Sequence, residues 1–156
     1  MEFVRRILVV DDEPHYANTL IRHLKREGFF ADLAHDDQAA TIKIEEAHSR
    51  KAPFDLIIMN TLIHTINGID LLAWAHKHHP GVSVILVSAY GHSDETIGRI
   101  RPDMDDYDKK PLTPQRMMEV IDSVERKRKC AHVRLRKQRD NLKDGLSEAP
   151  FAPVDT

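Results

Sequence analysis

The chain has 156 residues, of which 41% are hydrophobic and 31% charged, a balance typical of one globular domain and not of a disordered or membrane-embedded chain. Its single cysteine, Cys130, excludes an intrachain disulfide. The apolar run at 7–10 is too short for a signal-peptide core or a membrane span, so we expect a cytoplasmic protein. The formal net charge of -2 conceals a basic segment from Arg126 to Lys143 and an acidic remainder.

Short apolar runs alternate with helical patterns along the first 125 residues. The runs show little internal alternation, which is typical of parallel strands covered on both faces. In chain order, the strand candidates are 7–10, 29–34, 54–59, 82–87 and 105–108. The predicted helices run from Pro14 to the stop at Gly28, over 37–50, 69–79 and 93–100, and onward from Thr113–Pro114. This order predicts an open parallel sheet with helices on both faces and right-handed crossovers.

Polar side chains that could form a site follow the first, third, fourth and fifth predicted strands. Ligands bind such sheets beyond the carboxyl ends of the strands, near the point where the strand order reverses. Adjacent carboxylates repel each other unless a hard cation or an ammonium group compensates, and oxygen ligands of this kind suit Mg²⁺. The residues in question are Asp11, Asp12 and Glu13 after the first strand, Asn60 after the third, Ser88 after the fourth, and Lys110–Pro111 after the fifth.

Four spaced motifs stand in the order of a known family. They are "ILVVDDEP", "FDLIIMN" with Gly68 eight residues after Asn60, "VILVSAYG" and "DDYDKKP". Over about Arg5 to Glu125 the chain therefore resembles the receiver domain of bacterial two-component response regulators, of the chemotaxis-receiver type. The resemblance implies a flavodoxin-like doubly wound (βα)5 three-layer sandwich whose five-stranded parallel sheet has the order 2-1-3-4-5. It also implies a phosphorelay signalling protein rather than an enzyme, with a sensor histidine kinase or a downstream effector as partner.

The resemblance also implies a role for each polar position. Asn60 stands at the phosphoacceptor position, and Asp11, Asp12 and Asn60 together stand at the Mg²⁺ site. Ser88 and Lys110 match the residues that contact the phosphoryl group, and Tyr107 matches the switch aromatic. The Lys110–Pro111 bond is a candidate cis peptide, since X-Pro bonds adopt this form at small cost.

Asn60 is the main departure from the family pattern. A carboxylate can attack a phosphoryl group, whereas a neutral carboxamide is a poor nucleophile, so ordinary phosphorylation should fail. The missing negative charge should also weaken Mg²⁺ binding unless Glu13 or a backbone carbonyl compensates, and the acidic pair could rest against Lys110 instead. Three origins stay open: a natural degenerate receiver, an engineered Asp-to-Asn variant of an ordinary phosphorylated regulator, or deamidation that restores an Asp form.

Two further segments depart from the family. Ile63–His64 replaces the usual Met-Pro, which favours natural degeneration because the loop has changed more than one mutation requires. Pro102–Asp103–Met104 replaces an Ala-Gly-Ala run and predicts an early end to the fourth helix. Asp108 and Lys109 make the fifth strand unusually polar. The change at 102–104 and the polar residues of the fifth strand lie on the face formed by the fourth helix, the fifth strand and the fifth helix. Receivers usually signal or dimerise through this face.

The C-terminal segment has a pattern of its own. Residues 126–144 are expected to extend the fifth helix as a basic amphipathic arm, and 145–156 to form a disordered tail. Such an arm could pair in a homodimer or bind nucleic acid, but the absence of interleaved aromatic residues favours a solvated helix face. The apolar positions in a/d rhythm are Met117, Ile121, Val124, Ala131, Leu135 and Leu142.

The ten histidines suggest a metal site as an alternative, especially His76, His78 and His79 on the third helix. His76 and His79 could share a helix face, but no cysteine or carboxylate stands at zinc spacing, and a solvated helix end is favoured.

The preferred hypothesis is a single-domain degenerate receiver that acts by protein–protein contact. Its alternatives are the ordinary phosphorylated regulator, a nucleic-acid binder acting through the arm, and a Mg²⁺-dependent phosphoryl-transfer enzyme with Asp11 or Asp12 as nucleophile. The enzyme is disfavoured because the Asp-x-Asp spacing of aspartate-nucleophile phosphatases is absent and no phosphate-binding glycine loop follows the first strand.

Overall fold

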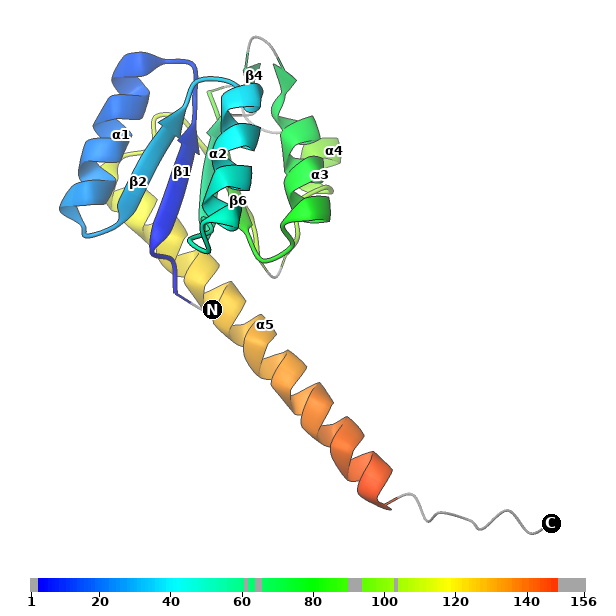
Figure 1. The fold of residues 1–156 in the computed structure, drawn as a ribbon. Coiled ribbons are helices and arrows are strands. Elements are labelled where there is room, and N and C mark those ends of the chain that lie inside the picture. Colours follow the sequence, from blue (N-terminus) through cyan, green and yellow to red (C-terminus); the bar gives the residue numbers. More distant parts are fainter. Residues whose placement is uncertain (1–2, 61, 64–65, 90–93, 103, 149–156) are drawn as a thin grey trace.

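The computed structural model describes residues 3–60, 62–63, 66–89, 94–102 and 104–148. Its centre is a five-stranded parallel sheet in the order β2-β1-β3-β6-β7, which confirms the predicted topology (Figure 1). The strands are β1 (Arg6–Val10), β2 (Phe30–Ala34), β3 (Leu56–Asn60), β6 (Ser83–Ser88) and β7 (Asp106–Lys109). Two short strands, β4 (Leu62–Ile63) and β5 (Ile66–Asn67), form a separate antiparallel pair.

Helices cover both faces of the sheet. They are α1 (Pro14–Arg26), α2 (Asp37–Ser49), α3 (Gly68–His78), α4 (Asp94–Ile97) and α5 (Pro114–Glu148). Pro14 occupies the first turn of α1, where its missing N–H costs nothing, and Gly28 follows the helix at a φ of 94° that favours glycine. The Asp36 carboxylate caps α2 by accepting the Ala39 N–H at 2.7 Å.

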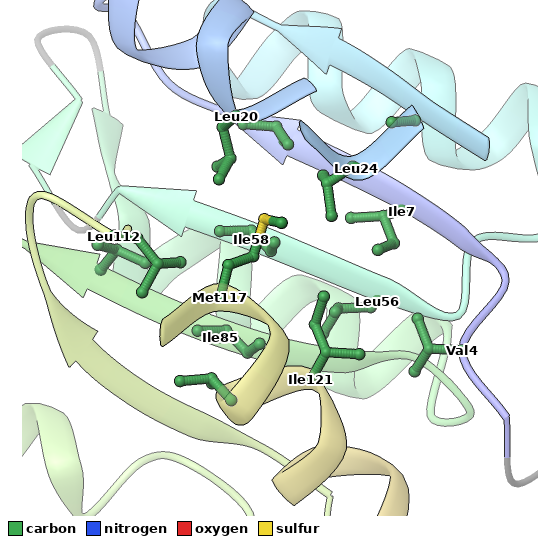
Figure 2. Close-up of a cluster of buried hydrophobic side chains, with 14 of the residues drawn as sticks. Val4, Ile7, Leu20, Leu24, Leu56, Ile58, Ile85, Leu112, Met117 and Ile121 are labelled. Carbon is green, nitrogen blue, oxygen red and sulfur yellow. The ribbon is translucent and has the colours of Figure 1, made fainter. Parts of the chain in front are cut away.

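Two apolar clusters form the core, one on each face of the sheet. Alternation along β1 sends Ile7 and Val9 to the cluster beneath α1 and α5, which Figure 2 shows around Leu24, Met117 and other residues. The intervening side chains of β1 join the second cluster, which α2 and α3 cover. The strands are therefore buried on both sides, as their continuous apolar runs predict.

The structure differs from the sequence expectations at three places. The antiparallel pair β4–β5 was not predicted, because strands of two residues are too short to show a periodicity. The fourth helix ends early, as Pro102 predicts, but it ends at Ile97 and not at residue 100, and bonds of the i to i+3 type follow it, from Arg99 N–H to the Thr96 carbonyl for example. The fifth helix continues past Gly145 to Glu148, so the tail does not begin at 145, and a single glycine costs a helix only about 1 kcal/mol. Residues 149–156 lie outside the described residues.

Buried polar groups also order the amino end of the sheet. Asp105 is fully buried just before β7. Its Oδ1 accepts the Val84 N–H at 2.8 Å, and its Oδ2 accepts the Arg101 N–H at 2.7 Å and lies 2.8 Å from His76 Nε2. This carboxylate therefore joins α3, β6 and the start of β7 far from the carboxyl ends of the strands.

Candidate functional site

The strand register brings three of the predicted residues to the carboxyl edge of the sheet. Val10 pairs with Met59, and Asn60 pairs with Val87, so the residues that follow β1 and end β3 and β6 lie at neighbouring points of that edge. These residues, Asp11, Asn60 and Ser88, are only 2%, 8% and 2% exposed. Three polar side chains buried at one edge are costly to maintain, which is typical of a functional site.

Asp11 is held by its neighbours on both carboxylate oxygens. Its Oδ1 accepts the Glu13 N–H at 2.9 Å, and its Oδ2 lies 2.8 Å from Lys110 Nζ. The ammonium is also 3.4 Å from Glu13 Oε1. The Lys110 side chain is 7% exposed, and it meets both acids at ion-pair distance without the orientation of a hydrogen bond. The structure thus brings Lys110 to Asp11, as one of the two expected arrangements had it, with Glu13 as a second acidic neighbour.

Tyr16 completes the surroundings of Lys110, and sequence reasoning missed it. Lys110 Nζ lies 4.4 Å from the centre of the Tyr16 ring, within cation–π range. The Tyr16 hydroxyl accepts the Leu112 N–H at 3.1 Å and so ties α1 to the loop after β7. Burial raises the pKa of Tyr16 to about 12, and the negative charges of Asp11 and Glu13 act in the same direction, against the effect of the Leu112 hydrogen bond. Only its position three residues after Glu13, in the first turn of a helix, could have drawn attention to it.

The remaining predicted residues take distinct positions. The Lys110–Pro111 peptide bond is cis, as predicted, and the Lys110 N–H donates to the Ser88 carbonyl at 3.0 Å. Tyr107 lies on the edge strand β7, paired in register with Leu86, and is 39% exposed. Asp12 is half-buried in the loop that follows β1. His64 and Asp103 belong to the segments that depart from the family pattern, and both lie outside the described residues.

The histidines at the end of α3 and directly after it have separate partners. His76 Nε2 contacts the buried Asp105, whereas His79 Nε2 lies 3.5 Å from Glu45 Oε1 and its ring packs against His48 and Trp74. Over the part of the chain that the structure describes, no group of three or more histidine, cysteine or acidic side chains is arranged to hold a metal ion. The contacts of His76 and His79 are those of packing and structural hydrogen bonding.

Comparison with known proteins agrees with this geometry. A model of the response regulator receiver domain matches residues 7–122. The chain belongs to the response regulator receiver domain family. Receiver domains are signalling proteins of two-component systems, and they interact with histidine kinases and effectors.

Solved receiver domains share the fold. A CheY-like receiver domain protein from Methanospirillum hungatei is 26% identical, with a TM-score of 0.70 over 82% of this chain and 98% of that one. The receiver domain of NtrX from Brucella abortus is also 26% identical, with a TM-score of 0.65 over 77% of this chain and 98% of that one.

Curated relatives of the receiver are longer proteins. The nitrogen assimilation regulatory protein NtrX of Azorhizobium caulinodans is 26% identical over 137 residues, which cover 88% of this chain and 28% of the relative. The DNA-binding response regulator MtrA of Mycolicibacterium smegmatis is 29% identical over 143 residues, 92% of this chain and 56% of the relative. The chain thus matches only part of the length of these regulators.

Receiver domains typically bind Mg²⁺ at the phosphorylation site. The oxygen donors here are of the kind that Mg²⁺ prefers, but the neutral Asn60 supplies one negative charge fewer than an aspartate would. Asp11, Asp12 and the carboxamide oxygen of Asn60 would hold it, and the ion would compete with Lys110 for Asp11 Oδ2. The bound ion would supply charge compensation for phosphoryl oxygens. Among the described helices, none is both long and apolar enough to cross a bilayer.

Proposed function

We propose that this receiver signals by protein–protein contact without phosphorylation at the usual position. The observation that carries the proposal is Asn60, which ends β3 beside Asp11 and Ser88 at the carboxyl edge of the sheet. A carboxamide at this point cannot form the acyl phosphate that an aspartate forms, because its nitrogen and oxygen are weak nucleophiles.

The surroundings of Asn60 support this interpretation. Lys110, which would otherwise meet a phosphoryl oxygen or an acceptor carboxylate, lies between Asp11 Oδ2 and Glu13 Oε1. The positive charge is therefore compensated within the loop after β1, and no incoming anion is needed to balance it. We infer that the site is stable in one arrangement and that Mg²⁺ binds it weakly.

The surface of α4, β7 and α5 is the proposed contact surface for a kinase, an effector or a second receiver. Tyr107 stands exposed on it. Arg116 of α5 forms ion pairs with Asp108 of β7 and with Glu119, so these three charged side chains are held in place on this face. Because strand β7 is more polar than the other four, its partner should be recognised by charge as well as by shape.

Intact-mass analysis after incubation with acetyl phosphate and Mg²⁺ tests the proposal. We expect the protein to keep its mass and an Asn60→Asp variant to gain one phosphoryl group. Asn60→Gln is the matched control, since it keeps a carboxamide and should stay unmodified. A phosphoryl group on the unsubstituted chain, stable to acid and lost at alkaline pH as acyl phosphates are, would overturn the proposal.

The ordinary phosphorylated regulator is the alternative. An aspartate codon at position 60 in the encoding gene would establish it and would make the behaviour of Asn60 a property of a variant. An asparagine codon, together with a tryptic peptide of unchanged mass around residue 60, would exclude both an engineered change and deamidation.

A further inference from the structure

The fifth helix continues well beyond the receiver domain. The family model ends at residue 122, whereas α5 ends at Glu148. Residues 129–148, called the arm below, extend away from the sheet as the orange and red part of α5 in Figure 1. The arm is not needed to cover the sheet, because the last buried residue of α5 is Arg128, directly before the arm begins.

Two side chains fix the root of the arm to the amino end of the sheet. Arg128 is 7% exposed and donates to the Asp55 carbonyl at 3.1 Å, the Gly81 carbonyl at 3.0 Å and Ser83 Oγ at 2.9 Å. Lys127 Nζ donates to the Asp105 carbonyl at 2.9 Å. The arm is therefore held in a set direction instead of pivoting on a flexible linker.

Beyond this root the arm is exposed and strongly basic. The arm carries six lysine and arginine residues and three acidic residues, Asp140, Asp144 and Glu148, so its basic side chains outnumber its acidic ones two to one. All six are exposed: Lys129, Arg134, Arg136, Lys137, Arg139 and Lys143. The chain outside 126–144 has the opposite balance, with 14 basic and 23 acidic residues.

Pairing of two arms is opposed by their own charges. Leu135 and Leu142 are seven residues apart and 66% and 69% exposed, so they could start a coiled-coil seam. In a parallel pair on that seam, Arg134 of one copy would face Arg139 of the other, and like charges at these positions repel. The seam also includes the polar Gln138. A second copy of the arm is thus a poor partner.

The distribution of charge around the arm favours a groove over a flat surface. Arg136 and Lys143, seven residues apart, share one side of the helix, whereas Arg134 and Lys137 share another. A helix that lies on a membrane needs a broad apolar face, which two leucines do not provide. The major groove of B-DNA is about 12 Å wide, admits one helix, and is bordered by phosphates on both sides.

We propose that the arm binds duplex DNA by lying in the major groove with its basic side chains on the flanking phosphates. Double-stranded RNA fits less well because its major groove is deep and narrow. Single strands are disfavoured because 126–144 holds no phenylalanine, tyrosine or tryptophan for stacking on bases. The acidic receiver body is repelled by the phosphates, so contact is confined to the arm, and binding depends little on base sequence.

Fluorescence anisotropy of the full chain with a labelled DNA duplex of two helical turns tests the proposal. The test variant is R134Q/R136Q/K137Q, which keeps helix-forming residues on the arm. The matched control is R22Q/K25Q/R26Q, which removes three exposed positive charges from α1. It therefore has the same net charge as the arm variant. Circular dichroism and urea unfolding establish that both variants fold.

We expect the unsubstituted chain to bind at about 50 mM salt and to weaken steeply towards about 200 mM. The arm variant should bind at least about tenfold more weakly, with a salt slope less steep by up to about 2.7, since each phosphate contact contributes roughly 0.9. The control should change affinity by less than about twofold.

Three results would overturn the proposal: no binding of the unsubstituted chain at low salt, equal loss in both variants, or tighter arm-dependent binding to polyglutamate or to vesicles of anionic lipid. The last would assign the arm to an acidic protein or to a membrane surface.

Discussion

The two ends of the sheet use buried charge in different ways. At the amino end, Asp105 and Arg128 bond mainly to backbone groups, which cannot change partner without unfolding. At the carboxyl end, Lys110 contacts two side chains, Asp11 and Glu13, and side chains can exchange partners. The amino end therefore fixes the fold and the direction of α5, whereas the carboxyl end retains the adaptable charges of a receiver site.

The largest expected effect is at the amino end. Asp105→Ala should destabilise the protein by about 3 kcal/mol or more, because the Val84 and Arg101 N–H groups lose a buried acceptor. Asp105→Asn keeps one acceptor oxygen and should lose less. Urea unfolding at neutral pH measures both, and a loss below about 1 kcal/mol in the alanine variant would contradict the structural role of this carboxylate.

Arg128→Ala should cost about 2–3 kcal/mol, since two carbonyls and the Ser83 hydroxyl lose a charged donor. Burial lowers the pKa of Arg128, the desolvation cost that these bonds offset. Arg136→Ala, eight residues further along the same helix and exposed, is the control and should change the unfolding free energy by about 0.5 kcal/mol or less. Equal losses would show that the arm is not anchored at 128.

The contrast between these two arginines also marks what the sequence could predict. Arg126 to Lys143 reads as one uniform basic segment, and helical periodicity places Arg128 at a position of the apolar stripe without identifying its acceptors. Those acceptors, at Asp55, Gly81 and Ser83, are 45 or more residues away in the chain. Partners so distant in sequence become visible only once the sheet and α5 are assembled.

A smaller effect is expected at the carboxyl end. Lys110→Met should destabilise the protein by about 1–2 kcal/mol, because Asp11, 2% exposed, loses its cation while its bond from the Glu13 N–H remains. Added Mg²⁺ should stabilise the variant more than the parent, since the ion can replace the ammonium. Thermal unfolding with and without Mg²⁺ measures this, and K109M, on the exposed neighbouring residue, is the control. An identical Mg²⁺ response in parent and variant would count against competition between Lys110 and the ion.

The smallest effect concerns Tyr16. Tyr16→Phe removes the acceptor of the Leu112 N–H and should cost about 1 kcal/mol at neutral pH. Since the folded pKa of about 12 exceeds the ordinary 10.0, the contribution of this group is fully present below pH 10 and is lost as the pH rises through 12. Unfolding free energies measured across that range should fall more steeply in the parent than in the variant, and parallel curves would refute the assignment.

Much of the site followed from the sequence because parallel strands deliver the residues after them to one edge. Asp11, Asn60 and Ser88 each follow or end an apolar run, and Lys110 follows the polar fifth strand, so their meeting needed only the strand order. Tyr16 escaped because it lies inside a helix, where a half-buried aromatic residue is ordinarily a packing residue. The ion-pair partner of Lys110 could not be predicted either, because it depends on distances in the folded structure that sequence spacing does not give.

The polar strand β7 has a consequence for the behaviour of the protein in concentrated solution. It is an outer strand of the sheet, and its residues alternate between half-buried and exposed, unlike the fully buried strands β3 and β6. An outer strand with free backbone groups and apolar side chains invites a further strand from another molecule. Asp106, Asp108 and Lys109 make such an addition costly, since it would bury charges, and the receiver is thereby protected against aggregation along its open edge.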